Sequence, residues 1–191
     1  MVSDVIQASK ALGTGGRAVS QPLEEALLDG LQQHLSMELN ASSAYWALAI
    51  WFAEREFRGF SLYFKQESDQ ERGHAGIFAD YLVGRGQPVA LDAIDKPRQN
   101  WDSLEEVFAA VFQIETEVTT SLMQLYSLAE RSGDVRTTVF LDPLIEKQTG
   151  AEAESAHLLG RLRLCENNPA ALLLLDGELF AGQSSPASMG S

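Results

Sequence analysis

The chain has 191 residues and a mass of 20.9 kDa, and 45% of its residues are hydrophobic, which suits one domain with a buried core. Its 27 acidic residues outnumber the 14 basic ones and give a net charge of −13. This charge argues against nucleic acid or an anionic membrane as a main partner, because phosphate binding uses clustered Lys and Arg, and no apolar stretch is long enough for a transmembrane helix.

The first predicted element is a flexible N-terminal arm, residues 1–20, which contains three glycines. This arm lacks the apolar segment of a secretory signal, so we expect a cytoplasmic protein. A short transit peptide, and with it a plastid location, stays open as an alternative.

Sparse glycines and prolines divide the following residues into four long helices and one short one. Pro22 suits the first turn of the first helix, Asp102 or Ser103 can cap the third, and Pro143 is expected to interrupt and kink the fourth. The expected helices cover about residues 22–55, 59–85, 103–132, 135–165 and 170–181, with a linker at 86–102 and a disordered tail at 183–191.

Each long helix carries apolar residues at alternating steps of three and four, which is typical of the seam of a helix bundle. The short breaks near residues 57 and 133 predict two antiparallel helix pairs. The linker between the pairs is long enough to run the length of the bundle. The sequence therefore predicts an all-α domain, residues 21–182, with four bundled helices, one long crossover and a short fifth helix.

Polar residues interrupt this apolar seam on all four long helices. No Lys or Arg on the seam offsets their charge, and an unpaired buried carboxylate is unfavourable unless it is neutralised or bound to a cation. The interrupting residues are Glu38, Glu67, Glu71, His74, Glu115 and Gln148.

Four of these residues are expected at one level of the bundle. Glu38 and Glu71 are 33 residues apart (71 − 38), as are Glu115 and Gln148 (148 − 115). At about 1.5 Å per residue, all four lie roughly 20–28 Å from their hairpin turn. His74 shares a helical face with Glu71. Several carboxylates with one imidazole favour Fe(II) or Mn(II), so the pattern predicts a dinuclear site bridged by Glu71.

The spacing of Glu38, Tyr45, Glu71, His74 and Glu115, followed by Gln148 and Ala151, resembles that of the non-haem ferritins over about residues 22–182. Residues 95–102 and 136–145 look most similar to ferritins of cyanobacteria. The resemblance implies a 24-subunit cage that oxidises Fe(II) with O2 and stores it as a ferric oxyhydroxide mineral.

The same resemblance implies roles for individual residues. Glu38, Glu71 and His74 would hold the first iron, and Glu71 and Glu115 the second. Gln148 would form a hydrogen bond beside the site. Tyr45 matches the tyrosine that has been proposed as an electron donor in ferritins.

Other iron proteins with a similar bundle differ from this chain at specific residues. Bacterioferritins carry a second Glu-x-x-His and a haem-binding methionine where this sequence has Gln148, Ala151 and Arg72, so we expect no haem. Rubrerythrin-like proteins need cysteine pairs, whereas this chain has only Cys165, which we expect to pack rather than react. DNA-binding mini-ferritins use a basic tail, which is missing here.

The remaining polar residues have more than one interpretation. Glu67 lies one turn before Glu71 and could pass a cation to the site, and Asp142 and Glu146 could extend that route or, especially Glu146, only complement a helix dipole. Glu154 and His157 fall one step off the seam and are read as a solvated pair. His34 is expected to be a polar surface residue.

Two other functions stay open at this point. One is a structural or mineral-nucleating cage subunit with an inactive centre, although the four retained ligands argue against it. The other is a monomeric or dimeric di-iron oxygenase, which the short fifth helix and the small size argue against.

Overall fold

The structure, a computed structural model, describes residues 11–16, 18–19 and 21–183. Most of the predicted C-terminal tail and the first ten residues of the predicted arm lie outside this range. Within the arm, β1 (Ala11–Leu12) pairs antiparallel with β2 (Ala18–Val19) across a short 3-10 turn, Thr14–Gly16. The backbone N–H of Thr14 donates to the carbonyl of Gly86 at 3.0 Å. This ladder therefore contacts the end of the second long helix.

The described residues contain five α-helices, which confirms the predicted all-α bundle. Their bounds lie within about three residues of the expected ones: α2 (Glu25–Ala53), α3 (Arg58–Gly84), α4 (Leu104–Arg131), α5 (Val135–Leu164) and α6 (Pro169–Gln183). The start of α4 follows the predicted cap, because Ser103 Oγ accepts from the N–H of Glu106 at 3.1 Å. The Glu106 carboxylate in turn accepts at 2.9 Å from the N–H of Asp102, the residue before the N-cap.

The predicted interruption at Pro143 is wrong, because α5 is one continuous helix across this residue. Proline removes the hydrogen bond to the carbonyl four residues earlier, and its ring crowds that carbonyl. Both Pro143 and Val139 are exposed, so water can satisfy that carbonyl. The helix can therefore continue on its solvent side.

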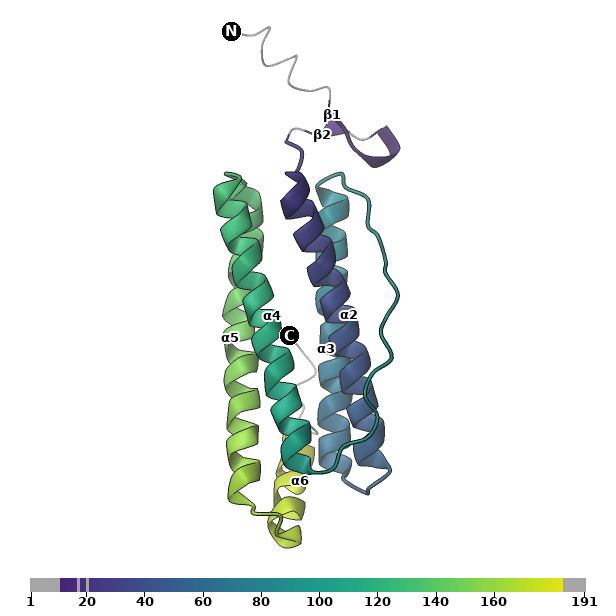
Figure 1. The fold of residues 1–191 in the computed structure, drawn as a ribbon, viewed down its shortest axis with the longest axis vertical. Helices are drawn as coiled ribbons and strands as arrows, with labels where there is room; N and C mark the ends of the chain where they lie inside the picture. Colours follow the sequence, from purple (N-terminus) through teal and green to yellow (C-terminus); the bar gives the residue numbers. More distant parts are fainter. Residues whose placement is uncertain (1–10, 17, 20, 184–191) are drawn as a thin grey trace, which may run out of the picture.

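The long crossover runs as predicted. Figure 1 shows the linker after α3 passing along the bundle beside α2 to the opposite end, where α4 begins. Polar side chains of α2 hold this linker, since Gln32 accepts from the N–H of Ala90 and Asn40 accepts from the N–H of Asp95, both at 2.8 Å. The two hairpins, α2–α3 and α4–α5, thus form one four-helix bundle.

The hydrophobic core consists of two clusters stacked along the bundle. One is rich in aromatic rings and lies where α6 packs, with Phe52, Phe60, Phe64 and Phe108 fully buried. The other is mostly aliphatic and is built around residues such as Leu31 and Leu125. Along α2, α3 and α4 the polar seam residues fall between the two clusters. This arrangement buries a polar layer in the middle of the bundle.

A buried ion pair ties the two hairpins together at the aliphatic end. Arg85, which follows α3, donates to Asp134 Oδ2 at 2.6 Å, and Asp134 also caps α5 by accepting from the N–H of Thr137. The guanidinium also donates to Tyr81 Oη at 2.6 Å. This cluster fixes the relative height of α3 and α5. In the described part of the chain, no helix combines the length and apolar character needed to cross a membrane.

Candidate metal centre

Each long helix contributes at least one polar side chain to the central layer. Glu38 comes from α2, Glu71 from α3, Glu115 from α4 and Gln148 from α5, and each is at most 5% exposed. Their burial follows from the local sequence, because they occupy seam positions between apolar residues on continuous helices. The bundle therefore takes four polar side chains out of water at one level, as the sequence predicts.

Three of the predicted ligands lie together in the described structure. Glu38, Glu71 and His74 each offer an atom, and these atoms lie within 4.8 Å of one another. A hydrogen bond of 2.8 Å joins His74 Nδ1 to Glu71 Oε2, and Glu38 Oε2 lies 4.0 Å from the same nitrogen. Two carboxylates and one imidazole at this spacing can chelate a single divalent cation.

Several polar atoms of this group are left without partners. Glu38 Oε2 and His74 Nε2 are buried and have no hydrogen-bond partner among the described residues. Buried polar atoms are almost always hydrogen-bonded, so such exceptions call for an explanation. A cation bound by Glu38, Glu71 and His74 provides one, since it would take the free lone pair of Glu38 and compensate its charge.

The electrostatics of the layer also favour a cation. Burial raises the pKa of Glu38, and it raises the pKa of Glu71 to about 7. Burial would lower the pKa of His74, but its hydrogen bond to Glu71 and the charges of both carboxylates outweigh this and raise it. Carboxyl groups that are difficult to ionise in the metal-free fold gain a compensating charge when a divalent cation binds.

Glu115 is held in a different way from the other carboxylates. The Tyr45 hydroxyl donates to its Oε1 in a short hydrogen bond, and Gln148 Nε2 donates to its Oε2 at 2.7 Å. Glu115 is not part of the three-residue group, although burial also raises its pKa. Gln148 and Tyr45 thus bind different oxygens of the Glu115 carboxylate.

Two cavities adjoin the layer and have four lining residues in common. The smaller, of about 30 Å³, is lined by Glu38, Glu71 and His74, and the larger, of about 270 Å³, by Tyr45 and Glu115. The first is large enough for a water molecule or an ion. The residues that line both are Glu67, Gln70, Lys147 and Ala151.

Glu67 is the predicted route residue that adjoins both cavities. Burial and the charge of Glu71 raise its pKa to about 8. Asp142 and Glu146 are exposed, and neither lines these two cavities. Lys147 is a basic residue that the sequence analysis did not place here. Its side chain is exposed and comes from the residue before Gln148, so its charge lies beside the layer and not on the seam.

The prediction that His34 is a surface residue is wrong. Its side chain is fully buried, with Nδ1 hydrogen-bonded to Ser121 Oγ at 2.8 Å and Nε2 lying 2.9 Å from Glu38 Oε1. The ring also packs on Phe78, with 4.5 Å between the centroids. The four-residue step from His34 to Glu38 is the one signal in the sequence that could have indicated this contact.

The other doubtful candidates lie outside the three-residue group. Glu154 and His157 are both exposed, and Glu154 lines the larger cavity opposite Glu67. Cys165 is half-buried and packs against the aromatic cluster, while its Sγ donates to the carbonyl of Arg161 at 3.3 Å.

Comparisons with known proteins agree with this geometry. The sequence model of the family described as ferritin-like domain matches residues 28–165. A bacterial non-heme ferritin of Bacteroides fragilis (strain YCH46) is 28% identical over 157 residues, which cover 82% of this chain and 98% of that protein. A bacterial non-heme ferritin of Staphylococcus saprophyticus is 29% identical over 159 residues, which cover 83% of this chain and 95% of that protein.

Solved structures share the fold over the same range. An open pore ferritin from the hyperthermophilic archaeon Archaeoglobus fulgidus superposes with a TM-score of 0.81 at 29% identity, covering 84% of this chain and 98% of that one. A PmFTN variant soaked in iron superposes with a TM-score of 0.77 at 29% identity, covering 80% and 98%. The similarity therefore extends over the whole bundle.

Proposed function

We propose that this chain, which belongs to the ferritin-like domain family, is an iron-storing ferritin subunit and a ferroxidase. The observation that carries the proposal is the convergence of Glu38, Glu71 and His74 in a buried layer where Glu38 Oε2 and His74 Nε2 have no partner. The substrate is Fe(II), which the layer binds, and O2 is the oxidant. The iron is then stored as a ferric oxyhydroxide mineral.

In this proposal the two iron positions have different ligands. Glu38, His74 and one oxygen of Glu71 hold the first Fe(II), and the other oxygen of Glu71 with Glu115 holds the second. Hydrogen bonds from Tyr45 and Gln148 hold the Glu115 carboxylate in place. When iron arrives, the imidazole gives up its hydrogen bond to Glu71 and its nitrogen becomes a ligand.

The second position has fewer protein ligands than the first, because it lacks an imidazole like that of His74. Gln148 is neutral, and Ala151, which lines both cavities, has no donor atom. Fewer protein ligands bind a cation more weakly, so the second iron is expected to leave once it has been oxidised. The pair is then a substrate in transit to the mineral and not a fixed cofactor.

Glu67 is the residue we propose to pass Fe(II) toward the centre. It lines the boundary between the two cavities, one turn before Glu71. We also keep Asp142 and Glu146 as proposed outer parts of such a route, although both side chains are exposed away from the two cavities.

The assembly and the cellular location are further parts of the proposal. Subunits of this family are expected to form a 24-chain cage, and exposed apolar side chains on α2 and the crossover, such as Trp46 and Ile94, support contacts between subunits. We also propose a cytoplasmic location and a particular similarity to cyanobacterial ferritins.

An anaerobic Fe(II) titration followed by exposure to O2 tests the proposal. We expect about two Fe(II) to bind per chain, and then rapid oxidation followed in the ultraviolet. Glu71→Ala and His74→Ala should abolish the rapid phase, while Glu154→Ala, which changes an exposed carboxylate, should leave it intact. Oxidation of two irons per chain at the wild-type rate by Glu71→Ala would exclude this site as the centre.

The same titration separates the two alternative functions. A cage subunit with an inactive centre would assemble but would show no rapid oxidation in the wild type. A small di-iron oxygenase would oxidise iron but would elute as a monomer or dimer, and it would keep its two irons after oxidation.

A further inference from the structure

We propose that His34, held by Ser121, is a positioning residue that orients the Glu38 carboxylate for the first metal ion. The inference rests on the proposed function and assigns it a residue outside the expected ligand set. His34 does not line the cavity beside Glu71 and His74, so it acts through Glu38 and does not touch the iron.

The two carboxylate oxygens of Glu38 have different surroundings. Oε1 lies 2.9 Å from His34 Nε2, whereas Oε2 is buried without a partner and lies 4.0 Å from His74 Nδ1. In the metal-free structure the contact with His34 is close but is not aligned as a hydrogen bond. The imidazole thus contacts one carboxylate oxygen and leaves the other facing the remaining ligands. A carboxylate that binds a metal ion through a single oxygen needs this arrangement.

Ser121 determines which ring nitrogen of His34 can donate a proton to Glu38. Its hydroxyl lies 2.8 Å from Nδ1, and donation from this hydroxyl leaves the single proton of a neutral imidazole on Nε2, next to Glu38. His34 can therefore donate from Nε2 to the Glu38 carboxylate.

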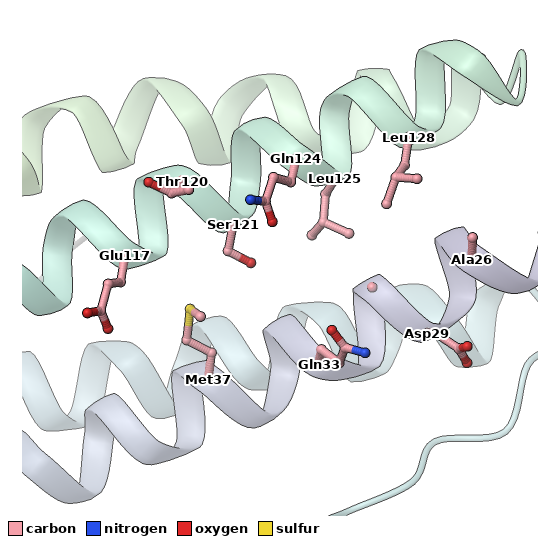
Figure 2. Close-up of a pocket in the computed structure, with 11 residues that line it drawn as sticks. Ala26, Asp29, Gln33, Met37, Glu117, Thr120, Ser121, Gln124, Leu125 and Leu128 are labelled. Atoms are coloured by element: carbon pink, nitrogen blue, oxygen red, sulfur yellow. The ribbon is translucent and has the colours of Figure 1, made fainter.

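The tertiary structure restricts the ring on the remaining sides. Phe78 of α3 packs on one side at 4.5 Å, and Ser121 reaches it from α4, 87 residues away in the sequence. Ser121 itself lines a groove of about 470 Å³ between α2 and α4, and Figure 2 shows it on the α4 side of that groove, facing Gln33 and Met37 of α2. Three helices thus fix the orientation of one imidazole.

An apolar residue at position 34 could fill the same space, so the presence of a histidine there indicates a role beyond packing. Such a residue would leave the Ser121 hydroxyl and Glu38 Oε1 without this contact inside the bundle. A purely structural histidine would stabilise the fold without changing metal affinity. A positioning histidine changes the affinity, because groups that hold a metal ligand typically contribute about 10- to 100-fold.

Anaerobic Co(II) titration of the metal-free protein tests the proposal without relying on oxidation. Visible absorption gives the dissociation constant and the stoichiometry, and thermal unfolding of each metal-free variant reports stability separately. The variants are His34→Leu, His34→Gln and Ser121→Ala. The controls are His157→Gln, an exposed histidine, and Ser127→Ala, an exposed serine on the same helix as Ser121.

We expect His34→Leu to weaken the tighter Co(II) site by about 10- to 100-fold. Ser121→Ala should weaken it less, His34→Gln should restore part of the affinity because an amide can still donate, and both controls should bind as the wild type does. The positioning role would be overturned if Ser121→Ala, and every His34 variant that folds, bound Co(II) with a dissociation constant within twofold of the wild type. This holds even if the unfolding temperatures of these variants fall. Failure of the wild type to bind Co(II) would instead contradict the proposed function.

Discussion

Glu38, Glu71 and Glu115 are three carboxyl groups that the bundle buries without a Lys or Arg hydrogen-bonded to any of them. Arg85 and Asp134 show the contrast, because this buried pair is neutralised by direct hydrogen bonds. At the scale of single residues, burial therefore disfavours the ionised forms of these carboxyl groups in the metal-free structure. Three predictions follow from the side chains of this layer.

The metal-free protein should lose stability as the pH rises. The pKa of Glu71 is raised from 4.5 to about 7 and that of Glu67 from 4.5 to about 8, mainly by burial. A folded-state pKa above the unfolded value means that the fold binds the proton more tightly. This contribution is fully present below about pH 4.5 and is lost as the pH rises through about 7 to 8.

Urea unfolding of chelator-treated protein at several pH values measures this effect. The free energy of unfolding should fall by about 1–3 kcal/mol between roughly pH 5 and 8, and Glu71→Gln should flatten the profile. Bound Zn(II) should also abolish the fall, because it replaces the proton. A pH-independent wild-type profile would contradict the electrostatic account.

Tyr45→Phe should remove a radical that forms during oxidation. The Tyr45 hydroxyl donates to Glu115, so an electron can leave the ring while the proton passes to this carboxylate. Rapid mixing of iron-loaded wild type with O2, followed by freezing, should give a tyrosyl signal in electron paramagnetic resonance. Tyr63→Phe, which changes the other tyrosine of the same cavity, should keep the signal. An unchanged signal in Tyr45→Phe would place the radical elsewhere, for example on Trp46 or Trp51.

Glu67→Ala should slow oxidation most when iron is scarce. A residue that delivers Fe(II) limits the rate only while the centre is unfilled, so the defect should shrink as iron approaches saturation. Stopped-flow oxidation over a range of iron concentrations measures this, with Glu154→Ala as the control on the other side of the cavity. Equal slowing at all iron concentrations would indicate that Glu67 is a ligand.

At the scale of the elements, α6 is joined to the bundle by a specific contact with the start of α3. Phe57, which precedes α3, offers no side-chain cap, but Asp176 of α6 accepts from the N–H of Phe60 at 2.8 Å. Gly59 permits this approach, because a Cβ there would lie 1.8 Å from the carbonyl oxygen of Asp176. An α6 residue thus caps a helix that begins more than a hundred residues earlier.

Gly59→Ala should therefore displace α6 and destabilise the protein by about 1–3 kcal/mol. Thermal unfolding measures the stability, and amide hydrogen exchange across α6 reports its displacement. Gly160→Ala is the matched control, because a Cβ there meets nothing within 4 Å and should stabilise α5 by about 0.5–1 kcal/mol. If both substitutions had the same effect, close packing at Gly59 would not be what holds α6.

At the scale of the whole molecule, several large apolar side chains are exposed on the surface of the single chain. Trp46 is 45% exposed, Ile94 52% and Leu174 65%, on three different elements. Trp46 and Ile94 line one surface hollow, and apolar patches often mark contacts between proteins. In the proposed cage, Trp46, Ile94 and Leu174 are therefore candidate residues for contacts between subunits.

The native protein should have a mass of about 500 kDa, since 24 chains of 20.9 kDa give this value. Light scattering coupled to size exclusion measures it, and electron microscopy of iron-loaded protein should show dense cores inside the shells. Trp46→Glu should reduce the assembled fraction, because a charge would be buried at an interface. A native mass of one or two chains would favour the oxygenase alternative.

The sequence by itself determined the architecture and the level of the polar layer. Steps of three and four residues define a helix face without reference to any partner, and the lengths of the connections limit how the helices can be ordered. The equal spacing of Glu38 to Glu71 and of Glu115 to Gln148 places these residues at one height for the same reason. All of this information is local or depends only on helix length.

Only the tertiary structure decided what surrounds each side chain. His34 is buried because Phe78 and Ser121 approach from two other helices, and Lys147 lies beside the cavities because its exposed side chain comes from the turn that carries Gln148. Pro143 leaves α5 unbroken because that side of the helix is open to water. Contacts across 87 residues or more depend on how the helices pack and rotate against one another, and helical periodicity does not specify this.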